Sequence, residues 1–100
     1  MSIRRRFLND ASNLKELAER LSKCKSVTKF DTDKEKEAWT LTHAFSDLEE
    51  SFYNFLEKQL PRLLQKDLNE KEITNLLLEI GEEFRHILYH IKDARFYCYL

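Results

Sequence analysis

One glycine and one proline in 100 residues are the feature that most restricts how this chain can fold. Both residues interrupt helices, because glycine gives up more backbone freedom on ordering and proline lacks the amide donor. Leu, Glu and Lys, which lose little rotamer freedom in a helix, are abundant instead. The sequence therefore predicts an all-α fold.

Apolar residues recur three and four positions apart in three segments, the spacing with which a helix packs along one side. These segments cover about residues 10–25, 32–60 and 69–95. Pro61 ends or kinks the second helix, and the residues after it form a short one. We expect a single domain over residues 1–100, folded as a small up-down bundle of three long helices and a short one. The apolar run of the third helix comprises Ile73, Leu77, Ile80, Phe84, Ile87, Ile91 and Ala94.

Two helix starts carry the capping-box pattern, in which two side chains satisfy each other's free backbone amides. Thr32 with Glu35 opens the second segment, and Asn69 with Glu72 opens the third. The third start is the better marked, because apolar residues flank it on both sides as in a hydrophobic staple. We expect the third helix to begin at about residue 69.

Charge is unevenly placed along the chain, although the net charge is only −1. Residues 1–36 hold ten Lys and Arg against six Asp and Glu, whereas residues 37–100 hold seven against twelve. We expect residues 1–9 to form a basic N-terminal arm. Such an arm can dock on RNA, on an acidic partner or on the acidic half of the protein itself.

Several function classes are disfavoured by what the sequence lacks. No apolar run approaches the roughly 20 residues that cross a bilayer, so we expect no membrane association and a cytoplasmic location. Cys24 and Cys98 stand far apart and outside any CxxC pair, so we interpret both as reduced thiols. With a single glycine, the chain has no phosphate-binding Gly-rich loop and no dinucleotide fingerprint. We therefore expect no cofactor.

The helical wheel places more apolar surface on the long helices than one packed side requires. Leu78, Tyr89 and Phe96 lie nearly opposite the apolar run of the third helix, while Trp39 and Tyr53 lie off the main run of the second. Clustered, exposed apolar groups usually mark an interface. We therefore predict that these five residues contact a second copy in a homodimer, or a helical protein partner, which completes the bundle. The expected function is an interaction module that acts in regulation or in a toxin–antitoxin type of system.

The stretch EEFRHILYH, residues 82–90, carries charged and imidazole side chains within the third helix. Glu83, His86 and His90 lie within about 60° of one another on the wheel, and two imidazoles with a carboxylate can hold one divalent metal ion. A solvated face of charge pairs explains the same stripe more simply, so we expect no metal and keep a metal-binding bundle as an alternative function. A second polar edge, on the second helix, comprises His43, Asp47 and Glu50.

The same stretch contains Arg85, then a polar residue, three more residues and His90. Placed in the last helix of a small all-α chain, this pattern resembles the HEPN superfamily, whose motif is an Arg separated from a His by four to six residues. The resemblance covers about residues 79–97 and implies a helical bundle that cleaves RNA without a metal, at a site shared by two subunits. It further implies that Arg85 neutralises the scissile phosphate, that His90 transfers protons and that His86 takes the polar position beside the arginine. A ribonuclease of this kind is the alternative to the interaction module.

Overall fold

The computed structural model describes residues 7–9, 11–24 and 34–98 of the chain. Helices joined by short turns and irregular segments make up these residues and no strand occurs among them, so the predicted all-α class is confirmed. The elements, in chain order, are the 3₁₀ turn η1 (Phe7–Asn9), α1 (Ala11–Ser22), α2 (Lys34–Asn54), the π-helical segment η3 (Phe55–Gln59), α3 (Leu60–Leu63) and α4 (Glu70–Cys98).

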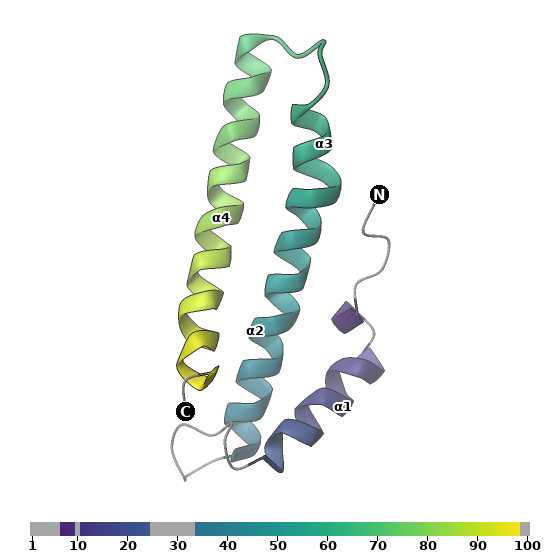
Figure 1. Cartoon of the computed structure of the whole chain (residues 1–100), viewed down its shortest axis with the longest axis vertical. Coiled ribbons are helices and arrows are strands. Elements are labelled where there is room, and N and C mark those ends of the chain that lie inside the picture. The colour runs from purple at the N-terminus through teal and green to yellow at the C-terminus, as the bar shows by residue number, and fades with distance from the viewer. Residues whose placement is uncertain (1–6, 10, 25–33, 99–100) are drawn as a thin grey trace.

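The long axis of the molecule is formed by two antiparallel helical columns (Figure 1). One column is α2, continued by η3 and α3, and the other is α4, which returns beside it after the turn that follows Leu63. The shorter α1 packs along the N-terminal part of α2, and no other helix among the described residues lies beside the distal part of the two columns (Figure 1). The molecule is therefore elongated, with extents of 53 × 24 × 17 Å.

The core lies at the end of the molecule where α1, α2 and α4 meet. Leu41 and Ala44 of α2 and Ala94 of α4 are buried together, and Leu21 of α1 and Phe45 pack against them. Alanine at the contact lets the helix backbones approach closely, which suits a core built from few layers. The other buried residues that the structure describes are Ala18, Ala38, Thr42, Ser51, Leu76, Ile80 and Ile87.

The start of α4 has the capping box that its sequence predicts. The backbone amide of Glu72 donates to Asn69 Oδ1 over 2.8 Å, and the amide of Asn69 donates to Glu72 Oε1 over 3.2 Å. These two bonds satisfy amides that the helix itself leaves without partners. Thr32, the cap expected for the second helix, lies outside the described residues.

Only the last part of the expected basic arm, residues 7–9, is described, and it forms η1. The carboxylate of Glu49 accepts hydrogen bonds from the amides of Phe7 and Leu8, each over 2.7 Å. This pair of bonds attaches η1 to α2. Residues 1–6 lie outside the described residues.

Pro61 changes the helix before it and does not end it. The helix widens into η3, where the Leu60 amide donates to the carbonyl of Phe55, five residues back, and the chain then stays helical to Leu63. Proline has no amide hydrogen and its ring crowds the carbonyl four residues earlier, which explains why the ordinary hydrogen-bond pattern is lost just ahead of it.

The buried side of α4 is narrower than its apolar run predicts. Ile80 and Ile87 are only 7% exposed, whereas Leu77, Phe84 and Ile91 of the same predicted run are 53%, 44% and 39% exposed. The reason is that α4 packs on a single column, α2 with η3, and one neighbouring helix covers only a narrow stripe. No helix among the described residues is long and apolar enough to span a membrane.

Candidate functional site

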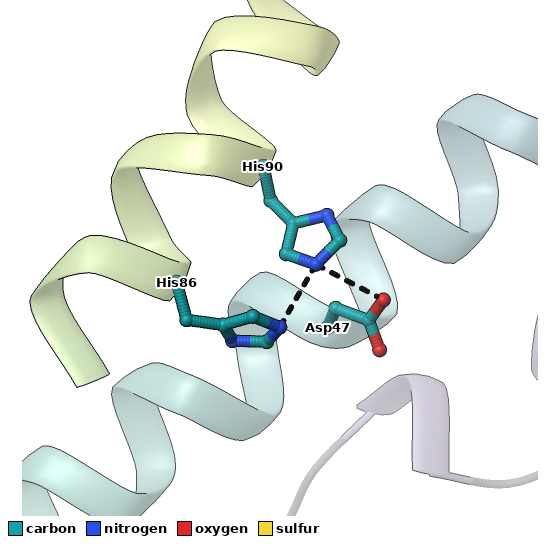
Figure 2. Close-up of side chains that lie close together, drawn as sticks. All are labelled: Asp47, His86 and His90. Carbon is teal, nitrogen blue, oxygen red and sulfur yellow. Dashed lines mark hydrogen bonds and ion pairs between the residues drawn. The ribbon is translucent and has the colours of Figure 1, made fainter. Parts of the chain in front are cut away.

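Two histidines one turn apart on α4 are directed toward α2 at the middle of the molecule (Figure 2). The Nε2 atoms of His86 and His90 lie 3.0 Å apart. The two rings meet edge to face, with centroids 4.5 Å apart and an interplanar angle of 88°. Residues four apart on a helix share a face, which is why a single helix can aim both imidazoles at one point.

Two polar residues of α2, also one turn apart, contact these histidines. Asp47 Oδ2 lies 3.3 Å from His90 Nε2, and Ser51 Oγ lies 2.7 Å from His86 Nδ1. Ser51 is only 2% exposed, although the positions near it on α2 and α4 bury mainly hydrocarbon. The interface between the two columns therefore contains a polar cluster, which we define as Asp47, Ser51, His86 and His90.

The Nε2 atom of His90 lies close to two polar groups, although one imidazole nitrogen can direct a hydrogen at only one of them. Figure 2 shows its Nε2 atom between His86 Nε2 and the carboxylate of Asp47. A neutral imidazole nitrogen carries either one hydrogen or one lone pair. A hydrogen aimed at Asp47 is not available to His86, so a single neutral tautomer cannot give both contacts a well-directed hydrogen bond.

A shallow pocket of about 380 Å³ opens beside the cluster and is lined in part by Asp47 and His90. Its walls include aromatic rings: Trp39 stacks on His43 with ring centroids 5.5 Å apart, and Tyr89 meets His90 edge to face at 5.2 Å. The side chain of His90 is 14% exposed and that of Asp47 is 48% exposed. Small molecules and ions in water can therefore reach the cluster.

The three residues predicted as catalytic are not gathered into one place within the chain. His86 and His90 belong to the polar cluster, but Arg85 forms an ion pair with Glu82 over 3.2 Å. The side chains of this pair are 76% and 67% exposed, so Arg85 projects into solvent. A site that uses Arg85 and His90 together would need a contribution from a second copy.

The metal ligands considered from sequence were Glu83, His86 and His90. Among the described residues, the group with the closest ligand atoms joins the two histidines to Asp47 of α2, and all its ligand atoms lie within 4.8 Å of one another. The sequence predicts Asp47 on a polar edge of the second helix, but helical periodicity alone cannot pair that edge with the histidines. Ser51 gave no signal, because one serine in a helix is usually a surface residue.

The predicted interface residues lie in three different environments. Leu78 and Tyr89 are 67% and 70% exposed, as an unpaired apolar face would be. Trp39 and Tyr53 of α2 are half-buried within the chain. The side chain of Phe96 lies outside the described residues.

No family model matches the chain, and no match was found among curated proteins or among solved structures.

Proposed function

We propose that the chain is a helical interaction module in which α4 pairs with the α4 of a second copy, so that two chains complete one bundle. The observation that carries this proposal is the apolar surface that α4 exposes. Leu77, Phe84 and Leu88 are 53%, 44% and 65% exposed, although each is a large apolar side chain. Exposed apolar side chains that cluster on one side of a helix usually mark a contact with another protein.

The shape of the molecule supports the same proposal. The radius of gyration is 16.8 Å, whereas a compact domain of this length is expected to have about 13 Å. A second copy packed along the two columns would make the particle less elongated.

The surface that we propose for this contact, the α4 face, comprises Leu77, Gly81, Phe84, Leu88 and Ile91. These positions are four, three, four and three residues apart, the spacing of a seam between two packed helices. The α4 face differs from the contact predicted from sequence, because Leu78 and Tyr89 lie to one side of it on the same helix. Leu88 is 65% exposed. A Cβ atom placed on Gly81 would meet nothing within 4 Å, so the lack of a side chain there has no packing reason within the chain. A glycine in a helix seam lets a neighbouring helix approach closely.

Charge at the two ends of α4 favours an antiparallel pair. The first turn carries Glu70 and Glu72, and the last turn carries Arg95. In an antiparallel pair centred near Phe84, the acidic end of each α4 lies beside the basic end of the other. The same surface on both copies then meets across a two-fold axis, which is the usual geometry of homodimers.

The proposal is tested by measuring the mass of the particle in solution by sedimentation at several protein concentrations. We expect the parent chain to form a dimer and Leu88→Glu to abolish it, because a carboxylate would be buried in the α4 face. Leu64→Glu is the matched control, since Leu64 is 72% exposed but follows α3 and lies outside the α4 face. This control should dimerise like the parent chain.

Two results would contradict self-association through the α4 face. A parent chain that sediments as a monomer even at high micromolar concentration would exclude a stable homodimer. A Leu88→Glu chain that dimerises as strongly as Leu64→Glu would place the contact on another surface.

The alternative proposal is a ribonuclease of the HEPN type with Arg85 and His90 at a site between two copies. The observation that favours it is the place of His90, whose ring lines an open pocket together with His43 and Tyr89. An imidazole in such a pocket suits proton transfer to or from a bound ligand. The Arg85 that would neutralise the phosphate has to come from the second copy, so this proposal also depends on dimerisation.

A further inference from the structure

We propose that Asp47, His86 and His90 bind one divalent transition-metal ion, Zn²⁺ or a close chemical relative, between α2 and α4. The three residues offer His86 Nε2, His90 Nε2 and Asp47 Oδ2, and their ligand atoms all lie within 4.8 Å of one another. Two of the three come from α4 and one from α2, so the ion would join the two columns (Figure 2). This site does not depend on the dimer proposed above.

Two of the three distances between ligand atoms are close to those of a tetrahedral zinc site. Zinc binds imidazole nitrogen and carboxylate oxygen at about 2.0–2.1 Å, which places neighbouring ligand atoms about 3.3 Å apart. The structure has 3.0 Å between the two Nε2 atoms and 3.3 Å between His90 Nε2 and Asp47 Oδ2. All three ligand atoms lie within 4.8 Å of one another, so rotation of the side chains of His86 and Asp47 toward each other would complete the site.

A cation also resolves the conflict at His90 Nε2. A metal ion accepts the lone pairs of both imidazoles and of the carboxylate at the same time, whereas a hydrogen can serve only one of these contacts well. Ser51 can hold His86 in this role, because its Oγ lies 2.7 Å from the other ring nitrogen of His86, Nδ1. In the tautomer whose Nδ1 donates its hydrogen to Ser51, the lone pair is on Nε2, and metal-binding histidines are commonly oriented by such a bond.

The types of ligand atom select the class of ion. Two imidazoles and one carboxylate suit Zn²⁺, Co²⁺, Ni²⁺ and Cu²⁺. Mg²⁺ and Ca²⁺ prefer sites made entirely of oxygen. Three protein ligands also leave one position of the tetrahedron open, and both Asp47 and His90 border the pocket beside the cluster. Water or a small anionic ligand in that pocket would complete the coordination.

The test is calorimetric titration of the full chain, freed of any purification tag, with ZnCl₂, accompanied by the visible absorption of bound Co²⁺. We expect one ion per chain and the strong d–d bands of tetrahedral cobalt, with no heat from MgCl₂. Asp47→Asn and His86→Ala should each weaken Zn²⁺ binding by at least about tenfold, because both remove a ligand. Circular dichroism checks that each variant keeps its helices.

Two matched controls separate this site from other zinc-binding explanations. His43→Ala removes the remaining histidine of the chain, which lines the same pocket but is not part of the ligand group. Glu83→Gln removes the carboxylate that sequence alone would pair with the two histidines. Both controls should bind Zn²⁺ within about twofold of the parent chain.

Three results would overturn the metal site. The first is a parent chain that takes up no Zn²⁺ at micromolar concentrations. The second is an Asp47→Asn chain that binds as tightly as the parent while Glu83→Gln loses affinity, which would place all ligands on α4. The third is an equal loss in His43→Ala and His86→Ala, which would indicate unspecific histidine binding.

Discussion

The two ends of the molecule use the same pair of antiparallel columns but differ in how well they bury them. At the α1 end, three helices enclose a core in which Leu41 is 4% exposed. Beyond the level of Glu49, where η1 is attached, the described residues form only the two columns, and large apolar side chains such as Leu77 and Phe52 are 53% and 44% exposed. At this end α2 and α4 therefore carry more apolar residues than the described part of the chain covers.

The polar cluster lies close to the boundary between these two ends. Asp47 and Ser51 flank Glu49 on α2, the residue that attaches η1. The α1 end is held by apolar burial, which is stabilising by about 25 cal/mol for each Å² removed from water. A metal ion at the cluster would join the two columns at this boundary. A second copy on the α4 face would cover exposed apolar residues on both sides of it, from Leu77 to Ile91.

The largest expected effect comes from comparing one leucine at each end. Leu41→Ala should lower the free energy of unfolding by about 2–5 kcal/mol, because the removed atoms leave a cavity in the three-helix core. Leu77→Ala should cost less than about 1 kcal/mol in the monomer, since half of that side chain is already in water. Urea unfolding followed by circular dichroism at low protein concentration measures both values.

The same pair of variants also separates folding from assembly. At high protein concentration the free energy of unfolding of the Leu77→Ala chain should fall further below that of the parent chain, because the variant loses contacts made only in the dimer. The loss of unfolding free energy in Leu41→Ala should be nearly the same at low and at high protein concentration. Equal losses for the two variants at low concentration would mean that Leu77 is packed as tightly in the monomer as Leu41, contrary to its 53% exposure.

A smaller effect, with opposite signs in monomer and dimer, is expected at Gly81. Gly81→Ala should stabilise the monomeric helix by about 1 kcal/mol, because alanine favours the helix and the new methyl group meets open space. The same methyl group should weaken the dimer, since it holds the two α4 helices apart. Thermal unfolding at low concentration gives the first quantity and sedimentation gives the second. A Gly81→Ala chain that is both more stable and equally dimeric would remove Gly81 from the proposed contact.

The local features of the fold could be predicted from sequence because they depend on neighbours in the chain. The reciprocal hydrogen bonds of Asn69 and Glu72 are an example, since both partners lie within one helical turn. The all-helical class follows in the same way from the near absence of glycine and proline. What Pro61 does was harder to foresee, because the widened turn of η3 and a simple helix end both relieve the missing amide donor.

The candidate site could be predicted only in part, because it is assembled across two helices. The helical spacing of four residues places His86 and His90 on one side of α4, but it does not show which residues of α2 lie opposite them. That depends on the relative shift and rotation of the two columns, which here bring Asp47 and Ser51 to the histidines. The width of the buried stripe on α4 could not be predicted from the sequence either, since it depends on how many helices pack against α4.

The smallest expected effect on stability belongs to Arg85, which lies on the exposed side of α4. Its ion pair with Glu82 has both side chains largely in water, so screening by solvent leaves it worth about 0.2–0.5 kcal/mol. Arg85→Ala should therefore unfold within about 0.5 kcal/mol of the parent chain in urea. Arg62→Ala, which removes another exposed arginine at α3, is the matched control.

This small cost is what makes Arg85→Ala a clean test between the two proposed functions. An interaction module should keep its dimer and its helices in this variant, because Arg85 lies beside the α4 face and contributes no apolar contact to it. A ribonuclease of the HEPN type should lose RNA cleavage in Arg85→Ala while retaining it in Arg62→Ala, because only the former removes the charge that would neutralise the scissile phosphate. Cleavage of a fluorescent RNA in the presence of a chelator measures this difference. Since the fold scarcely depends on Arg85, a selective loss of cleavage would have to come from the chemistry and would favour the ribonuclease over the interaction module.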